Sequence, residues 1–357
     1  EYRIESGLNC GGHAFATQGY LLGPILLEFR NHRKNLERQT YEILVQALSN
    51  KSIQMPTFEL PTKITVQGGV GTAEEHQFLI KHYKMDSVGW GTPFLLVPEA
   101  TTVDNITLNQ LIEAKEEDLY LSNISPLGVP FNSLKGNTKD IEKLSLIAKG
   151  TPGSKCSKKH LTLNSEYTEK TICTASRQYQ QLKLKELENE GLSPDEYQEK
   201  AQKVLDKSCI CVGLGTSTLL ANNLDTRAEG KGVSICPGPN LAYFSKTMSL
   251  KEITDHIYGR ANMVTRNDRP HMFIKELHIY IAYLKTKIED LKTSSSVKQE
   301  QYVATFADNM NEGIRYYHQL FIESKDWFKD SKNDILQELE SMKQSLHLLS
   351  LKTELPA

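Results

Sequence analysis

Three glycine-containing segments in the first hundred residues carry the side chains best suited to chemistry. They read Gly11-Gly12-His13, Gly68-Gly69 and Gly91-Thr92. A histidine side chain titrates near neutral pH, so it can take or give a proton at a site formed by such a loop. We therefore interpret His13 as the candidate catalytic acid or base.

The apolar runs that precede these glycines predict short strands, and the amphipathic runs between them predict helices. The strand expected at residues 63–66 ends just before Gly68, and the strand that starts near residue 86 ends around Gly91. This alternation indicates consecutive parallel βα units, whose glycine loops open on one rim and expose backbone N–H groups to a phosphate. The predicted cofactor-binding residues are Gly11, Gly12, Gly68, Gly69, Gly91 and Thr92.

The same three segments resemble the carboxyl-terminal half of the nitronate monooxygenase family. That family, once called 2-nitropropane dioxygenases, includes the flavin-type enoyl-acyl-carrier-protein reductases. Its members share a Gly-Gly-His loop, a Gly-Gly-Ile/Val loop and a Gly-Thr-Arg-Phe loop. Here the loops read Gly11-Gly12-His13, Gly68-Gly69-Val70 and Gly91-Thr92-Pro93-Phe94, and the resemblance covers roughly residues 1–100.

The resemblance implies an FMN-dependent oxidoreductase in which His13 lies beside the flavin and the glycine loops hold its phosphate. It also implies a small-molecule substrate of the nitronate or enoyl thioester class. Pro93 stands where the family usually has arginine, and it supplies neither a cation nor a backbone donor.

By the same resemblance, the strands would be the last three of a (β/α)8 TIM barrel. A complete barrel needs about 250 residues, yet only three βα units precede residue 100. We therefore expect a partial barrel that a missing amino-terminal half or a partner chain completes. The alternative is that the three units form a small open sheet of their own.

The rest of the sequence predicts an α/β fold class in which the barrel part is followed by a mainly α-helical domain. We expect residues 1–120 to form the flavin-binding part, 121–248 an irregular cysteine-bearing α/β region, and 249–357 the helical domain. Residues 19–50 predict two successive helices, and Thr72 with Glu75 forms a capping-box pattern for the helix after Gly71. Residues 123–138 predict an extended loop, and core packing is the default interpretation of Trp90.

Ser193-Pro194 opens the second of two helices expected within residues 174–207. Apolar periodicity predicts helices over four carboxyl-terminal segments. Those four segments are 249–259, 268–292, 296–323 and 331–350, which suggests a bundle or a cover on the sheet.

Five cysteines beyond the barrel part invite a metal-site interpretation. Their spacing includes Cys-x-Cys on a predicted strand but no Cys-x2-Cys, so we favour separate buried thiols over a metal site. An iron–sulfur cluster is the alternative, because some flavin barrels pair FMN with one. The weak metal-ligand candidates are Cys156, Cys173, Cys209, Cys211 and Cys236.

Two further clusters receive structural interpretations. Gly213-Leu-Gly215 follows an apolar run and is interpreted as a structural turn rather than a second anion site. Arg260, Arg266, Arg269 and His271 are interpreted as a solvated helix start, with an anionic substrate tail as the alternative.

The charge balance and hydropathy argue against two partner classes. Lys and Arg number 42 and Asp and Glu 44, so no strong field favours nucleic acid or an anionic membrane. The sequence contains neither a long apolar run nor a signal-peptide pattern, and we expect a cytoplasmic protein. Two functional alternatives to the flavin enzyme stay open: a non-catalytic binding or assembly module, and an iron–sulfur flavoprotein.

Overall fold

The computed structural model describes residues 1–9, 18–58, 60–293 and 296–351. The chain forms two compact units, which are described separately. The first contains Glu1–Leu8, Ala16–Trp90 and Asp268–Ala357, and the second contains Asn9–Phe15 and Gly91–Asn267. Helices and two small sheets make the described part a mixed α/β protein.

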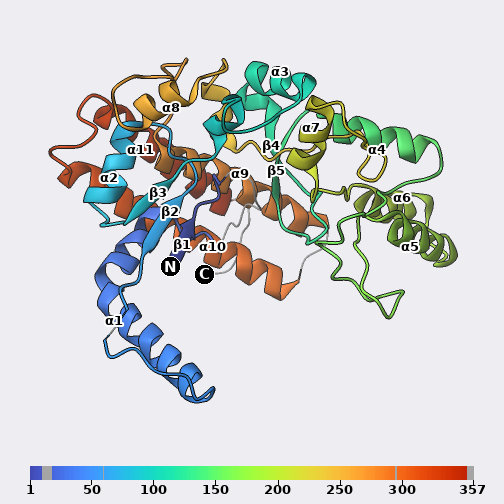
Figure 1. The fold of residues 1–357 in the computed structure, drawn as a ribbon, viewed down its shortest axis with the longest axis horizontal. Coiled ribbons are helices and arrows are strands. Elements are labelled where there is room, and N and C mark those ends of the chain that lie inside the picture. Colours follow the sequence, from blue (N-terminus) through green and yellow to red (C-terminus); the bar gives the residue numbers. More distant parts are fainter. Residues whose placement is uncertain (10–17, 59, 294–295, 352–357) are drawn as a thin grey trace. The chain divides into compact units, whose positions relative to one another are not determined.

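The first unit is built on three parallel strands in the order of the sequence (Figure 1). Strand β1 spans Tyr2–Glu5, β2 spans Ile64–Gln67 and β3 spans Ser87–Gly89. Tyr2 pairs with Ile64 in the first ladder. The parallel strands predicted around residues 64 and 87 are thus confirmed, each within one or two residues.

The crossover helices of this sheet are α1 (Leu22–Ser49) and α2 (Ala73–Lys81). Thr72 caps α2, and the reciprocal bond from Glu75 completes the predicted capping box. Residues 22–49 form one continuous helix instead of the two that the sequence suggested, because the polar residues between the apolar stripes include no helix breaker.

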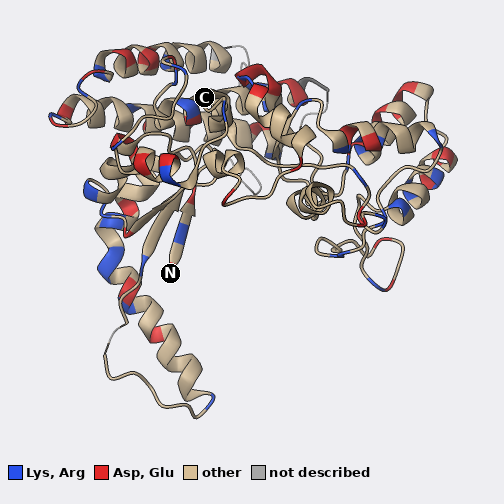
Figure 2. Cartoon of the chain, turned by 45° about the horizontal axis from the view of Figure 1, so that its top comes forward, with Lys and Arg blue, Asp and Glu red and all other residues tan. Residues whose placement is uncertain are grey.

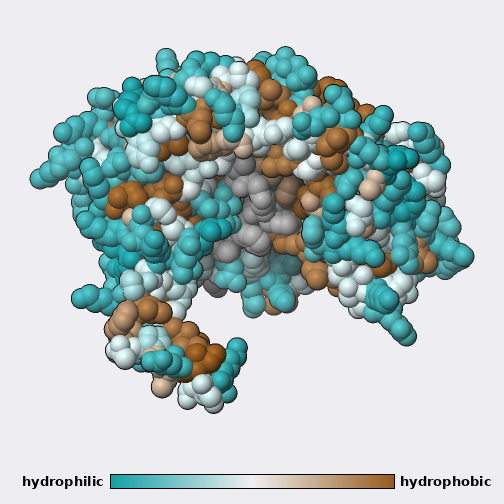
Figure 3. Space-filling view, in the orientation of Figure 1, coloured by the Kyte–Doolittle hydropathy of each residue, from teal (hydrophilic) through white to brown (hydrophobic). Residues whose placement is uncertain are grey.

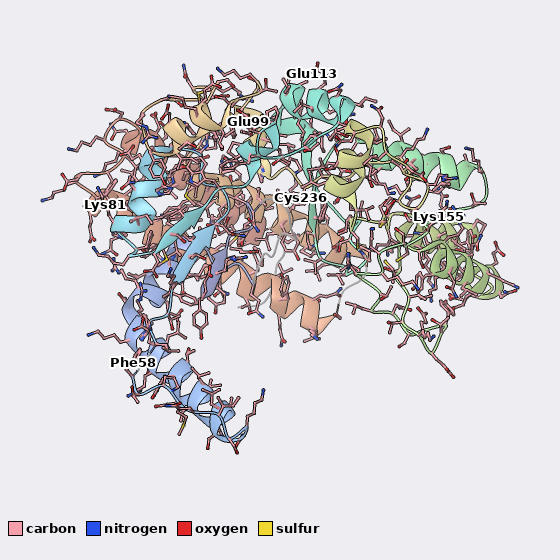
Figure 4. All side chains as sticks on the ribbon, in the orientation of Figure 1. Phe58, Lys81, Glu99, Glu113, Lys155 and Cys236 are labelled. Carbon is pink, nitrogen blue, oxygen red and sulfur yellow. The ribbon has the colours of Figure 1, made fainter. Side chains whose placement is uncertain are left out.

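The carboxyl-terminal half of α1 extends beyond the sheet (Figure 1). This half and the segment that returns from it to β2 carry exposed apolar side chains (Figure 3). They are Ile43, Ile53, Met55, Phe58 and Leu60, of which Phe58 is labelled in Figure 4.

Three carboxyl-terminal helices complete the first unit: α9 (Met272–Thr293), α10 (Val297–Glu323) and α11 (Lys332–Leu351). Phe273 and Leu277 of α9 share one buried cluster with Ile64 and Val66 of β2. The alternative of a helical cover on the sheet is therefore confirmed for these three helices. These helices belong to the same compact unit as the strands. The domain division predicted from the sequence had instead placed them in separate domains, 1–120 and 249–357.

The second unit holds the remaining elements around a core that includes Leu96, Leu111 and Tyr243. An antiparallel pair, β4 (Leu119–Ser122) and β5 (Phe131–Leu134), is its only sheet among the described residues. Both basic and acidic side chains lie on the helices of residues 177–189 and 194–205 (Figure 2). Its α-helices are α3 (Asn105–Glu113), α4 (Thr138–Ala148), α5 (Arg177–Asn189), α6 (Pro194–Leu205), α7 (Gly213–Ala221) and α8 (Leu250–Ile257), and its short 3-10 helices are Thr92–Leu96, Glu116–Asp118 and Pro239–Tyr243.

Two local predictions in the second unit are wrong. The stretch 123–138, predicted as an extended loop, contains β5, because Phe131 and Leu134 bury apolar side chains beside β4. The apolar run at 209–212 is not a strand, and Gly213-Leu-Gly215 is not a turn but the start of α7. An apolar run of four residues does not distinguish a strand from the approach to a helix.

A complete (β/α)8 barrel is not present in the part of the chain that the structure describes. None of the helices in the described ranges combines the length and the apolar character needed to cross a membrane.

Candidate functional site

The carboxyl end of β2 is the part of the predicted site that the structure defines best. Directly after Gln67, Gly68 has a φ of 103° and Gly69 a φ of 84°. Residues that carry a Cβ atom rarely adopt such positive φ angles, so the turn requires glycine at both positions. Both residues are buried. The structure thus places the two predicted residues in a side-chain-free turn at the rim of the sheet.

Gly69 also has a packing role. A Cβ atom at this position would lie 2.4 Å from Cδ1 of Leu8, which is shorter than any contact between carbon atoms. Glycine is therefore required here for two reasons that are independent of any ligand.

The next backbone donors along the loop are engaged by an internal anion. The carboxylate of Glu75 accepts the N–H of Gly71 at 2.8 Å and the N–H of Thr72 at 3.2 Å. It also accepts the N–H of Met272, the first residue of α9, at 2.8 Å. One buried carboxylate thus satisfies donors at the amino-terminal ends of α2 and α9, where a negative charge is favoured.

Arg269 neutralises this carboxylate. Its Nη1 and Nη2 lie 2.8 and 2.9 Å from Oε1 and Oε2 of Glu75, and Nη2 also donates to the carbonyl oxygen of Gly69 at 2.9 Å. The Arg269 and Glu75 side chains are only 6% and 2% exposed. Burial alone would raise the pKa of Glu75, but the charge and hydrogen bonds of Arg269 outweigh it and the pKa is lowered.

His271 lies beside this pair among aromatic rings. Its imidazole packs edge-on against Phe321 and Phe328 and is tilted against Phe273. Nδ1 accepts the N–H of Phe273 at 3.1 Å. Burial lowers the pKa of His271 to about 4, so the side chain is neutral at physiological pH.

These positions correct one interpretation from the sequence. Arg269 and His271 are buried parts of the loop support, whereas a solvated helix start was predicted. The sequence gives little sign of this role, because the partner Glu75 lies far away along the chain and had already been assigned to a capping box.

The two faces of the sheet differ in character. Ile4, Ile64 and Val66 point into the core. On the opposite face, Arg3, Glu5 and Ser87 are exposed and Gln67 is half-buried, with Nε2 of Gln67 donating to Oε1 of Glu5 at 2.7 Å. A parallel sheet usually has both faces covered, so a polar open face beside the glycine turn is suited to contact a polar ligand.

Trp90 follows β3 at the same end of the sheet. Its indole Nε1 donates to Nδ1 of His76 on α2 at 3.0 Å, and the ring packs against the core of the first unit. Core packing, the interpretation favoured from the sequence, is thus confirmed for this residue.

The predicted residues Gly91 and Thr92 belong to the second unit. Gly91 has a φ of −123° and precedes the 3-10 helix Thr92–Leu96, whose Phe94 N–H bonds to its carbonyl oxygen at 3.0 Å. This value of φ is open to any residue, so the backbone here does not require glycine. Thr92 is buried. That the two residues contribute to a cofactor site stays a prediction.

The remaining motif residues, Gly11, Gly12 and His13, lie outside the described residues. The catalytic role of His13 and the cofactor contacts of the two glycines therefore stay predictions.

The structure brings together four of the five candidate cysteines, all in the second unit. Cys156, Cys173, Cys209 and Cys211 affect one another's ionisation, and hydrogen bonds join them in two pairs. Cys236 does not act on the pKa of these four thiols. It packs with Ile124, Phe131 and Ile210, the residue between Cys209 and Cys211.

No family model, no curated protein and no solved structure matches this chain.

Proposed function

We propose that the chain is part of an FMN-dependent oxidoreductase of the nitronate monooxygenase type. The observation that supports this best is the turn at Gly68 and Gly69. Two successive glycines with positive φ follow the middle strand of a parallel sheet, and the carboxyl ends of such strands are the usual place for phosphate-bearing cofactors.

The residues fit a phosphate at one part of the rim and not at another. Gly68 has no side chain that would obstruct a phosphate, whereas Leu8 fills the side-chain space of Gly69. Gly71 and Thr72 donate to Glu75 and are not available as an anion site. The Glu75–Arg269 pair has instead a supporting role, because a bond from Arg269 to the Gly69 carbonyl group fixes the turn.

FMN, when bound, would supply the electron transfer of the reaction. His13 would take a proton from the carbon next to the nitro group of a nitronate precursor, or give one to an enoyl thioester. The resemblance supports this role, because a histidine side chain can take or give a proton in such a step.

The proposal is tested by titrating the protein with FMN and following flavin fluorescence. Gly68→Ala forces a methyl group into positive φ at the proposed phosphate site. Gly191→Ala is the matched control, since Gly191 has a φ of 67° and open space around it. We expect Gly68→Ala to weaken FMN binding at least about tenfold, which corresponds to 1.4 kcal/mol, and Gly191→Ala to leave it unchanged. If both variants bound FMN with equal affinity, the turn at Gly68 would not be part of the FMN site.

A second candidate is a non-catalytic binding or assembly module. It is favoured by the internal packing roles of Gly69 against Leu8 and of Gly71 against Arg269, which explain these glycines without a ligand. This candidate predicts that the wild-type protein binds no FMN.

A further inference from the structure

The cysteine pair Cys156 and Cys173 is held together by the backbone of the segment between α4 and α5. The N–H of Ser154 donates to the carbonyl oxygen of Ala175 at 2.9 Å, and the N–H of Arg177 donates back to Ser154 at 2.9 Å. These bonds bring the two ends of the loop 154–177 together. Cys156 and Cys173 lie just inside those ends and are therefore near each other.

A second set of bonds brings the Cys-x-Cys pair to the same place. Thr174, which follows Cys173, donates its hydroxyl at 3.1 Å to a carbonyl oxygen of the segment 124–126. Ser208, which precedes Cys209, donates its N–H at 3.0 Å to another carbonyl oxygen of that segment. One short segment therefore anchors both cysteine-bearing stretches.

The four thiols form two hydrogen-bonded pairs, Cys156 with Cys173 and Cys209 with Cys211. The charge of Cys209 also acts on Cys156 and on Cys173, and both of these act on Cys211. The two thiol pairs are thus neighbours from three separate stretches of the chain, although no three of these side chains already stand in metal-binding geometry.

Backbone donors point at three of these sulfur atoms. The N–H of the residue three positions on bonds to Cys156, and the N–H of the residue two positions on bonds to Cys173 and to Cys209. Burial nevertheless raises the pKa of Cys156, and that of Cys173 to about 12, so the backbone bonds orient these two side chains as neutral thiols. Cys156 has a φ of 55°, which indicates a tight knuckle around its thiol.

We propose that Cys156, Cys173, Cys209 and Cys211 bind one thiophilic metal centre, either Zn²⁺ or an iron–sulfur cluster. Four cysteine thiolates are the ligand set of structural zinc sites and of the common iron–sulfur clusters. The proposal is independent of flavin binding, because all four residues belong to the second unit.

In the described structure, no three His, Cys, Asp or Glu side chains already stand in metal-binding geometry. The thiols instead bond to one another in pairs. Binding would replace each thiol proton by a bond to the metal, release the protons to solvent and draw the two pairs together. No oxidant is needed for a zinc site, whereas two disulfides would require one.

Metal analysis of the full chain tests this proposal. The protein is purified under reducing, anaerobic conditions, reconstituted with Zn²⁺ or with iron and sulfide, and assayed for bound metal and visible absorbance. We expect about one zinc per chain, or several irons with broad visible absorbance. Cys173→Ser and Cys209→Ser should lose most of the metal. Cys236→Ser is the control and should keep it, since this buried cysteine packs against Ile210 and is not one of the four proposed ligands.

Alkylation of the wild-type protein gives a second measurement that needs no variant. We expect bound metal to protect the four cluster cysteines from a thiol reagent, and a chelator to expose them, without a change at Cys236. The proposal is overturned if the wild-type chain retains neither metal, if Cys236→Ser loses as much metal as Cys209→Ser, or if peptide mapping finds the four cysteines in two disulfides.

Discussion

Arg269 and Glu75 form a buried bidentate ion pair between residues 194 positions apart in the chain. The pair joins the beginning of α2, which follows the glycine turn, to the beginning of α9 from the carboxyl-terminal helices. The rim of the parallel sheet is thus supported by a segment that the sequence assigned to a different domain.

Removal of the arginine should be costly. Arg269→Ala leaves Glu75 charged and unpaired in a buried site, for which we expect a loss of about 3–5 kcal/mol in the free energy of unfolding. Both tryptophans, Trp90 and Trp327, lie in the first unit, so denaturant unfolding followed by tryptophan fluorescence reports on it.

The matched control for this measurement is Lys343→Ala on α11. Lys343 and its partner Glu340 are both about half exposed at 3.6 Å, and exposed pairs contribute at most about 1 kcal/mol. Similar losses for Arg269→Ala and Lys343→Ala would show that the buried pair does not support the rim.

Ionisation of the buried Glu276 carboxyl group should lower the free energy of unfolding as the pH rises. Burial raises its pKa from 4.5 to about 7, although its carboxylate accepts the N–H of Leu22 and the hydroxyl of Tyr317. The folded state therefore binds the proton more tightly than the unfolded chain. Its stabilising contribution is complete below pH 4.5 and is lost as the pH rises through about 7, a difference of about 3 kcal/mol.

The measurement is the free energy of unfolding between pH 4.5 and pH 8 for the wild-type protein and for Glu276→Gln. Glutamine keeps an acceptor for Leu22 and has no titration in this range, so we expect this component of the pH dependence to disappear. An unchanged slope in the variant would contradict the assignment to Glu276.

Gly69 should respond to a double-mutant cycle with Leu8. Gly69→Ala places a methyl group against Cδ1 of Leu8, and overpacking and positive φ should together cost about 2–4 kcal/mol. Leu8→Ala removes the clashing atoms but leaves the backbone strain. We expect the double variant to be more stable than the sum of the single losses by at least about 1 kcal/mol. Simple additivity would mean that Leu8 does not restrict this position.

Local signals in the sequence predicted local structure. Thr72 and Glu75 gave a capping box at the correct helix start, and Ser193-Pro194 opened α6 as expected. The parallel order of the strands followed from glycine turns and apolar runs. These features depend on residues close together in sequence, for which propensity and pattern are informative.

Contacts between residues that lie far apart in the sequence were not predicted. Nothing near Glu75 indicates that its carboxylate pairs with Arg269, and the spacing of the four cysteines fits no common motif, since loops of very different lengths separate them. The core shared by β2 and α9 likewise depends on contacts between distant segments. Such pairs form through tertiary packing, and a short stretch of sequence does not show which distant residue will be the partner.

Substitution of His13 should slow turnover without weakening FMN binding. His13→Gln removes the titrating imidazole, and we expect the variant to bind FMN as the wild-type protein does but to oxidise a neutral nitroalkane, which must first lose a proton, at least about a hundredfold more slowly. A fully active variant would exclude His13 as the acid or base.

The absorbance spectrum of the purified protein, recorded across the near-ultraviolet and visible range with and without added FMN, tests the central proposal most directly. We expect the two flavin bands in protein freed of unbound FMN, and we expect them to weaken in Gly68→Ala but not in Gly191→Ala. A protein that retains no flavin under either condition would contradict the flavin-enzyme proposal and favour the binding-module alternative.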